Sequence, residues 1–409
     1  NFSLFFKAFF LVLGVFVVFS SAEYVRKYLS HPGEYYGILM LSILAMMLMA
    51  ASGELLTAYI SLELLSFSLY VLVSFNRSDR RSNEAGIKYI LLGAFASALL
   101  LYGISQVYGM LGTTNFAEIR AALLLEETPL NPAVLIGLAL IVAGLGFKMA
   151  AVPFHMWAPD VYEGAPTPVT AFLAVGAKAA VVALVLRLFS QAFMPAIDDW
   201  RVILVILSAL TMTVGNLVAM AQKNIKRMLA YSSIGHVGYL LMGVAALSPL
   251  ASDGVILHLV GYGFSNMAAF MGIIIFYNVT TKENIEDFSG LADRSPYLAM
   301  AMSVALFSLA GLPFFAGFTT KFYLFTAVAN EGLLWMVGLA ITNSLISLYY
   351  YLMVVKQMYM VPASDGSPLR VPLMSRGVLG VLVLAIFVVG MYPGPLVSAV
   401  QSATRVILP

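Results

Sequence analysis

The chain has 409 residues, of which 61% are hydrophobic and only 10% are charged, and its net charge is +2. Soluble domains are about 45–50% apolar and about 25% charged, so this composition excludes an ordinary soluble protein and predicts an all-α, polytopic membrane protein. The small net charge, without a basic block, argues against a nucleic-acid partner, and the absence of cysteine excludes disulfides and iron–sulfur ligation.

Twelve apolar runs along the chain are long enough to cross a bilayer, because a spanning helix needs about 20 apolar residues. The first run has no clear small-residue cleavage site, so we expect a spanning helix there rather than a signal peptide. The runs cover approximately residues 3–21, 36–52, 54–75, 86–112, 133–152, 167–193, 202–221, 228–247, 254–279, 297–329, 333–361 and 377–400.

Two of these runs are broken by helix-terminating residues. Run 133–152 stops at Pro153, and run 297–329 is interrupted by the glycine- and proline-rich segment GLPFFAGF. Irregular backbone at membrane depth is tolerated only where it is buried in protein or lines a watery cavity. We therefore expect a functional site near mid-membrane, at these breaks.

The two broken runs lie five runs apart, and this odd offset gives them opposite orientations in the membrane. Runs two to six and seven to eleven then form two inverted five-helix repeats, each with its broken helix in fourth place. The predicted division is an N-terminal helix and loop (1–35), a first repeat (36–193), a second repeat (194–361) and a C-terminal loop and helix (362–409).

Basic residues of the short loops and span ends gather on one face if the spans alternate. That face is expected to be cytoplasmic or its organellar equivalent, with both termini on the opposite side, and the bacterial plasma membrane is favoured over a thylakoid or mitochondrial inner membrane. The basic face has Arg26, Lys27, Arg77, Arg80, Arg81, Lys88, Lys223, Lys226, Arg227, Lys282, Arg294, Arg370 and Arg376, and the opposite face has only Lys7, Arg120, Arg187, Arg201 and Arg405.

Four charged residues, Glu63, Lys148, Lys178 and Lys321, lie deep inside these apolar runs. A central charge costs roughly 2.5–3.5 kcal/mol on insertion scales, so such residues face protein or water and are functional candidates. A Lys–Glu pair about 7 Å apart, at an effective dielectric of about 20, is worth roughly 2.4 kcal/mol. Moving one charge through about 100 mV costs about 2.3 kcal/mol. The energy of making or breaking such a pair is therefore on the scale of proton transfer against a membrane potential.

Each of the four has a structural alternative. Glu63 has no basic residue within a helical turn, so its partner must come from another helix, unless it is a protonated carboxyl that hydrogen-bonds between helices. Lys148 lies five residues before Pro153, close enough to bind carbonyls freed by the break. Lys178 is flanked by small residues that also suit close helix packing, and Lys321 follows the second break.

Four further polar residues are weaker candidates. His236, in YSSIGHVGYLL, suits a proton relay because histidine titrates near neutral pH, but it also suits a hydrogen-bonded packing role. His258 lies only a few residues into its run and ranks lower. Asp160 and Glu163 follow the first break, where capping or subunit contact is expected. Without paired histidines or a phosphate-binding fingerprint, no metal, redox cofactor or nucleotide is expected in this chain.

Several long segments resemble a known family. The stretches SLELLSFSLYVL, GFKMAAVPFHMWAPDVYEGAPTPVTAFL, LAYSSIGHVGYLLMG and LAGLPFFAGFTTKFYLF are similar to those of the antiporter-like proton-pumping subunits of respiratory complex I. The resemblance covers about residues 24–359, and DVYEGAPTPV favours the subunit N branch, to which mitochondrial subunit 2 and its chloroplast and cyanobacterial counterparts correspond. A lysine rather than a glutamate at position 321 argues against subunit M.

The resemblance implies a fourteen-helix plan, of which the twelve runs match the third to fourteenth helices, so the first two are expected to be missing here. It places the family's Glu–Lys pair on Glu63 and Lys148, the connecting lysine on Lys178 and the lysine of the second broken helix on Lys321. The implied path for protons runs laterally through these residues and is driven by quinone reduction in another subunit.

The predicted function is therefore that of a non-redox, proton-translocating subunit of an NAD(P)H or ferredoxin:quinone oxidoreductase. Its expected partners are the other antiporter-like and small membrane subunits and the lipid bilayer, with FMN, iron–sulfur clusters and quinone in partner subunits. One alternative is a subunit of a multisubunit Na⁺/H⁺ antiporter, which shares the fold and the buried lysines. Another is a scaffold that only supports its neighbours.

Overall fold

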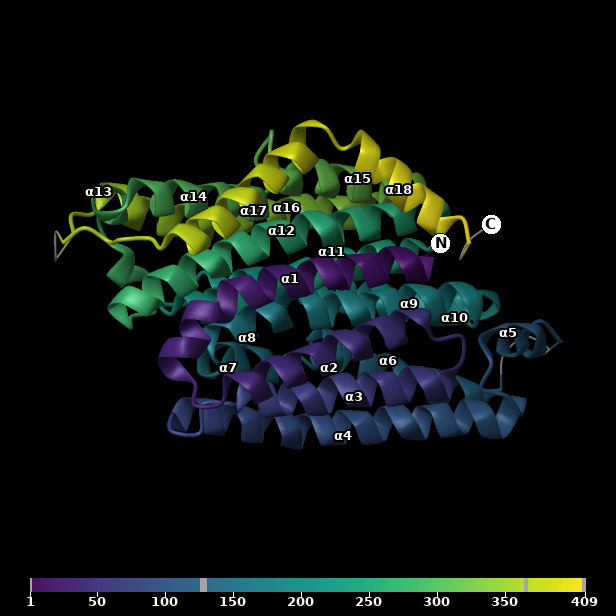
Figure 1. Ribbon diagram of the computed structural model, residues 1–409. Helices are drawn as coiled ribbons and strands as arrows, with labels where there is room; N and C mark the ends of the chain where they lie inside the picture. Colours follow the sequence, from purple (N-terminus) through teal and green to yellow (C-terminus); the bar gives the residue numbers. More distant parts are fainter. Residues whose placement is uncertain (1, 126–130, 364–366, 407–409) are drawn as a thin grey trace.

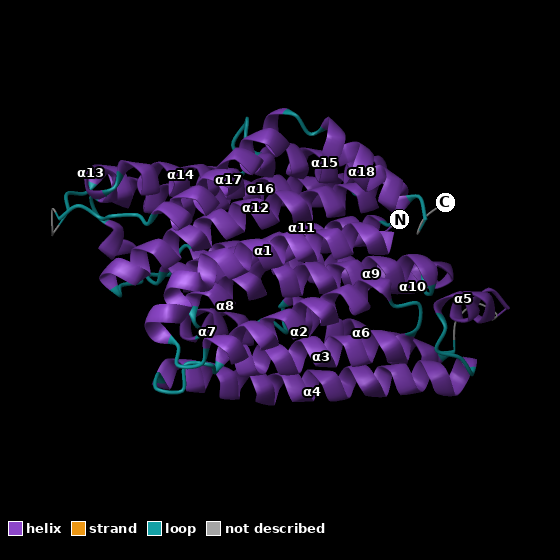
Figure 2. Ribbon diagram, in the orientation of Figure 1, coloured by secondary structure: helices purple, strands orange, loops and turns teal. Residues whose placement is uncertain are grey.

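The computed structural model describes residues 2–125, 131–363 and 367–406, and this part of the chain is a bundle of long helices without a strand (Figure 2). The helices run roughly along one common axis (Figure 1). They are α1 (Phe2–Tyr28), α2 (Pro32–Ala51), α3 (Leu55–Val73), α4 (Arg80–Leu111), α5 (Phe116–Leu125), α6 (Pro132–Met149), α7 (Trp157–Gly164), α8 (Thr167–Phe172), the π-helical segment η1 (Leu173–Ala177), α9 (Lys178–Gln191), the 3₁₀ turn η2 (Met194–Ala196), α10 (Ile197–Ala219), α11 (Ile225–Ala246), α12 (Pro249–Thr280), the 3₁₀ turn η3 (Ile285–Phe288), α13 (Leu291–Arg294), α14 (Pro296–Ala310), α15 (Ala316–Asn330), α16 (Leu334–Met360), α17 (Leu373–Met391) and α18 (Gly394–Thr404).

The expected polytopic membrane architecture is confirmed. Within the described residues, 11 helices are long and apolar enough to cross a membrane, with α8, η1 and α9 counted as one. The remaining predicted run, 297–329, is the pair α14 and α15, each 15 residues long and too short to span alone. The last predicted run, 377–400, forms two helices instead of one: α17 ends at Met391 and α18 begins at Gly394, with Pro393 between them.

Both predicted breaks are present, and both end in the same backbone conformation. Ala150 follows α6 with φ 61°, and Gly311 follows α14 with φ 88°, so each helix closes on a left-handed residue. Trp157 Nε1 donates to the carbonyl of Phe147 (2.9 Å) across the first break. The freed N–H of Val152 donates to Thr211 Oγ1 of α10 (3.0 Å), so the second half of the chain helps to hold the break of the first.

Two isolated antiparallel bridges occur at corresponding places in the two halves. Glu54, just before α3, pairs with Asn115, after α4, and Asn224, just before α11, pairs with Asn284, after α12. The helices α4 and α12 are each 32 residues long. These correspondences support the interpretation as two inverted repeats, and the bounds of the four predicted segments stay a prediction.

The centre of the bundle is formed by α9, α11 and α12, which are almost wholly buried. They lie between α4 on one side and α17 on the other (Figure 1). Both chain termini lie at one end of the helices, and α13 lies at the other (Figure 1). Lys178, His236 and His258 are carried by the central helices, so their side chains are inside the protein rather than toward lipid.

Candidate functional site

Glu63 on α3 and Lys148 in the last turn of α6 form a buried ion pair. Lys148 Nζ lies 3.4 Å from Glu63 Oε1, and it donates to Ser66 Oγ (2.7 Å) and Ser97 Oγ (3.1 Å). Ser97 in turn donates to Glu63 Oε1 (2.6 Å). The partner of Glu63 therefore comes from another helix, as expected. The structural alternative for Lys148, in which it binds carbonyls freed by the break, differs from the observed geometry, because its ammonium donates to Ser66 of α3 and Ser97 of α4.

Lys178 is the first residue of α9, directly after the π-helical segment Leu173–Ala177. A single π turn interrupts the regular hydrogen-bonding pattern of an α-helix, and such turns occur often at functional sites. The Lys178 side chain is 3% exposed, its ammonium donates to Ser233 Oγ of α11, and it lies 5.6 Å from the centre of the Tyr162 ring. Lys178 thus sits in the core with neutral partners.

Lys321 of α15 reaches back across the second break. Its ammonium donates to the carbonyls of Leu309 (3.0 Å) and Ala310 (3.2 Å), at the end of α14, and to Ser344 Oγ of α16 (3.0 Å). A cation is favoured at these free carbonyls because they form the negative end of the helix dipole. The carbonyl contacts that form the structural alternative for Lys148 are therefore made by Lys321. Beside the ammonium, a cavity of about 500 Å³ opens between α15 and α16.

None of the ion pairs in the described part of the chain includes Lys178 or Lys321. A buried ammonium whose partners are all neutral is costly to keep. Both lysines therefore differ from Lys148, which has a carboxylate within contact distance.

His236 and His258 link these two lysines. His236 Nδ1 lies 3.2 Å from His258 Nε2, and His258 Nδ1 lies 3.3 Å from the hydroxyl of Thr320, the neighbour of Lys321 in sequence. His236 is one helical turn after Ser233, the partner of Lys178. His258 lies deeper in its helix than the sequence indicates: the apolar run starts at residue 254, whereas α12 begins at Pro249 and His258 is fully buried.

Counting from the bridge residues aligns the polar groups of the two repeats. Glu63 lies nine residues after Glu54, and Ser233 lies nine residues after Asn224. Ser66 and His236 each lie twelve residues after the same starting points. The carboxylate of the first repeat thus has a serine as its counterpart, so the second repeat has no carboxylate at the position that corresponds to Glu63.

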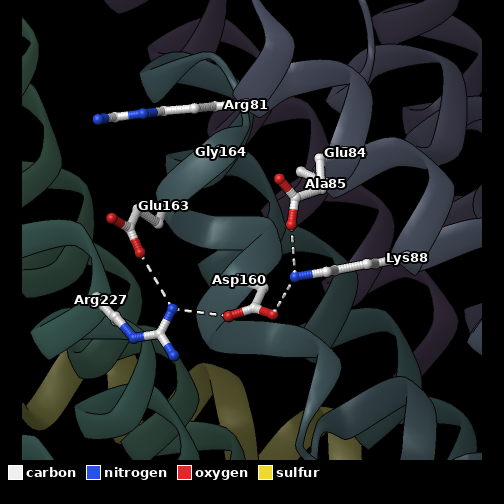
Figure 3. A pocket seen from close by; sticks show the side chains of 8 residues that line it. All are labelled: Arg81, Glu84, Ala85, Lys88, Asp160, Glu163, Gly164 and Arg227. Carbon is white, nitrogen blue, oxygen red and sulfur yellow. Dashed lines mark hydrogen bonds and ion pairs between the residues drawn. The ribbon is translucent and has the colours of Figure 1, made fainter.

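Asp160 and Glu163 of α7 form ion pairs within the chain rather than acting as caps (Figure 3). Arg227 Nη1 lies 2.7 Å from Asp160 Oδ1 and 3.0 Å from Glu163 Oε2, and Lys88 Nζ lies 2.8 Å from Asp160 Oδ2. Partial burial raises the pKa of the Asp160 carboxyl, but its bonds to Lys88 and Arg227 outweigh burial and hold that pKa below its ordinary value. This network joins α4 and α7 of the first repeat to α11 of the second.

No group of three or more histidine, aspartate or glutamate side chains that would suit a metal ion occurs among the residues that the structure describes. The polar groups in the interior around these residues are proton donors and acceptors, among them the carboxylate of Glu63, the ammonium groups of Lys148, Lys178 and Lys321, the imidazoles of His236 and His258 and several hydroxyls. Such a set is able to pass protons between neighbours.

Comparison with known proteins places this geometry in a family. Residues 52–347 match the family model described as "NADH:quinone oxidoreductase/Mrp antiporter, TM". The NADH-quinone oxidoreductase subunit N of Moorella thermoacetica is 46% identical over 410 aligned positions, which cover 100% of this chain and 86% of the relative.

Two solved structures show the same fold. A chain of respiratory complex I from Thermus thermophilus with bound aureothin is 32% identical, with a TM-score of 0.79, and the match covers 95% of this chain and 85% of that one. A chain of the Mrp complex from Dietzia sp. has a TM-score of 0.88 at 21% identity, with 98% and 83% covered, which shows a likeness of fold alone. The chain therefore belongs to the family of membrane subunits shared by NADH:quinone oxidoreductases and Mrp antiporters, and within it to the subunit N group.

Proposed function

We propose that this chain moves protons across the membrane as a subunit of an NADH:quinone oxidoreductase and contains no redox centre itself. The observation that carries the proposal is the buried series Lys178, Ser233, His236, His258 and Thr320, which ends at Lys321. Each member is a proton donor or acceptor, and consecutive members are hydrogen-bonded or neighbours on one helix. Membership of the subunit N group supports the oxidoreductase as the parent complex.

In this proposal Glu63 is an electrostatic switch and Lys148 the central proton carrier. Ion pairs about 4 Å apart are worth about 4 kcal/mol at a dielectric of about 20, compared with about 2.3 kcal/mol for moving one charge through about 100 mV. The contact of 3.4 Å is closer than the 7 Å used above, so breaking this pair costs more, and forming it supplies more, than that estimate. Lys178 connects the two repeats, and Lys321 is the carrier on the exit side.

His236 is proposed as a relay between Lys178 and Lys321, together with His258. A neutral imidazole accepts a proton on one nitrogen while it donates from the other, so two stacked histidines pass protons without a large movement. Their ring centroids are 5.3 Å apart. The hydroxyl of Thr320 completes the connection to the neighbourhood of Lys321.

The complex supplies what this chain lacks. We propose that FMN, iron–sulfur clusters and the quinone site lie in partner subunits and that their electron transfer drives the ion-pair switch. We also propose that the basic face is cytoplasmic in a bacterial plasma membrane and that both termini lie on the other side.

A cation/proton antiporter is the second candidate, and the fold likeness to the Mrp complex favours it to that extent. The 46% identity to a subunit N weighs more than a likeness at 21% identity. Purification from native membranes distinguishes the two. A flavin- and iron–sulfur-containing arm that co-purifies with this chain supports the oxidoreductase, whereas a cation-dependent pH gradient without electron transfer supports the antiporter.

The test of proton transfer uses Lys148→Ala and Lys321→Ala in the assembled complex, in sealed membrane vesicles. Both variants should pump fewer protons per electron, while Lys282→Ala, an exposed lysine of the basic face, should behave as the unaltered complex. Full pumping by both variants would show that the assigned roles are wrong. Unchanged pumping after all four buried charges are neutralised would instead support a scaffold.

A further inference from the structure

A polar cavity of about 420 Å³ opens on the basic face, where α1, α4, α7 and α11 meet the segment after α12. We refer to this cavity as the vestibule. Most of the residues that line it are polar or charged, among them Asp79, Arg81, Glu163 and Lys282. Glu163 and Arg81 also line the neighbouring pocket of about 290 Å³, where Arg227 holds Asp160 and Glu163 (Figure 3). The vestibule is large enough to hold several waters.

A buried ion pair lies against the vestibule. Lys226 Nζ is 2.7 Å from Glu283 Oε1, with side chains only 3% and 13% exposed. Lys226 also donates to the carbonyl of Ala165 (3.3 Å), in the link between α7 and α8. Lys226 is the second residue of α11, where the helix dipole disfavours a cation. Because buried pairs add little stability and this helix end disfavours lysine, helix stability does not explain the residue.

The interior beyond Lys226 leads to Lys178. Lys226 and Ser233 lie seven residues apart on α11, which is two turns on one face and about 10.5 Å along the axis. Ser233 accepts the hydrogen bond of Lys178. The helix face that begins at the vestibule therefore ends at the connecting lysine.

Two buried hydroxyls on the α7–α8 segment have no regular hydrogen bond among the described residues. They belong to Tyr162 and Thr167, which are 0% and 1% exposed and flank Ala165, the backbone contact of Lys226. The Tyr162 ring also contacts Lys178. Buried hydroxyls are normally satisfied by protein or by water, so these two are suited to hold waters between Lys226 and Lys178.

We propose that Lys226 and Glu283 form the proton entrance of this chain, on the route from the vestibule to Lys178. Lys226 releases one Nζ proton inward, toward the hydroxyls of Tyr162 and Ser233. The neutral amine then takes a proton that reaches it from the vestibule through Glu283. One proton enters for each proton passed on, and only N–H and O–H bonds change. This inference rests on the proposed function.

Lys226→Arg separates proton transfer from a structural role. Arginine retains the positive charge and the pair with Glu283, but it does not release a proton in proteins. The larger guanidinium has space because Lys226 borders the vestibule. If the Lys226–Glu283 ion pair is only structural, Lys226→Arg should pump normally. The entrance role predicts that Lys226→Arg loses as many pumped protons per electron as Lys178→Ala does.

The measurement is proton pumping per electron by the assembled complex in vesicles, with Lys223→Arg as the matched control, because Lys223 is an exposed lysine of the basic face that does not line the vestibule. If Lys226→Arg does not assemble, Glu283→Gln takes its place, with the same expected loss. If the assembled Lys226→Arg or Glu283→Gln variant pumps normally while Lys178→Ala is deficient, the proposed entrance role is wrong and the proposed function still stands. Normal pumping by both Lys226→Arg and Lys178→Ala contradicts the proposed function itself.

Discussion

Lys148, Lys178 and Lys321 are all buried, but they are stabilised in different ways. Lys148 has a carboxylate and two serines, Lys178 has a serine and an aromatic ring, and Lys321 has two helix-terminal carbonyls and a serine. Only the first of these environments has a formal negative charge. In the proposed mechanism, proton transfer away from Lys148 therefore depends on Glu63, whereas Lys178 and Lys321 each lose a proton without the breaking of an ion pair.

Glu63→Gln tests the switch. The amide keeps the shape of the side chain and its bond to Ser97 but removes the charge next to Lys148. We expect proton transfer through this chain to slow by roughly 10²-fold, the low end of what a positioned acid–base group contributes. Glu54→Gln, at the start of the same helix, is the control, because the Glu54 carboxylate accepts its bonds from Thr57 in the first turn of α3 and from Thr114 in the segment between α4 and α5, away from Lys148. Equal pumping by the two variants would contradict the switch.

Asp160 gives a pH prediction outside the spanning helices. Its pKa is held below the ordinary value of about 3.9 by Lys88 and Arg227 despite partial burial. A depressed folded-state pKa stabilises the protein above the unfolded pKa, and this stabilisation is lost as the pH falls through the folded value. Asp160→Asn should therefore cost about 1–3 kcal/mol throughout pH 5–8. Thermal unfolding of the variant and of the unaltered protein across that range measures the difference, and a difference that vanishes at pH 6 would be inconsistent.

At the scale of elements, each break depends on contacts that are distant in sequence. The presence of the breaks, and the lysines beside them, were predictable from Pro153 and from the Gly–Pro cluster, because these residues end helices by local geometry. The residues that contact these breaks and lysines were not predictable from the sequence. Thr211, Ser233 and His258 reach the site only after α10, α11 and α12 have packed, and serine or histidine in an apolar run gives no signal of what it will contact.

Gly317→Ala tests how tightly the second break is packed. A Cβ at Gly317 would lie 1.7 Å from the carbonyl oxygen of Ser308, so α15 would have to move away from α14. We expect a loss of about 1–3 kcal/mol, the usual cost of overpacking, with a lower yield of assembled complex. Gly338→Ala on α16 is the matched control, since a Cβ there meets nothing within 4 Å. Thermal stability equal to that of the control would contradict the packing of this break.

At the scale of the whole molecule, the two halves meet along the central helices. Composition and hydrophobic runs were sufficient to predict an all-helical membrane protein, because the membrane requires long apolar helices wherever the chain crosses it. They did not predict the short helix α5 or the charged network between α7 and α11, which depend on loop conformation and on contacts between the repeats.

The predicted sidedness is testable because the chain has no cysteine of its own. Lys282→Cys and Arg120→Cys place single thiols on the basic face and on α5, where both native side chains are exposed. A membrane-impermeant thiol reagent should label Lys282→Cys only in inside-out vesicles and Arg120→Cys only in intact cells. The reverse pattern would place the basic face outside and invert the proposed direction of transport.

The central claim is that buried lysines carry protons rather than fixed charge, and Lys321→Arg tests it most directly. Lys321 borders a cavity of about 500 Å³, so the guanidinium has room and its charge remains at the carbonyls of Leu309 and Ala310. Arginine does not release its proton. In sealed vesicles of the assembled complex, we predict that Lys321→Arg pumps as few protons per electron as Lys321→Ala. Full pumping by Lys321→Arg would contradict the account.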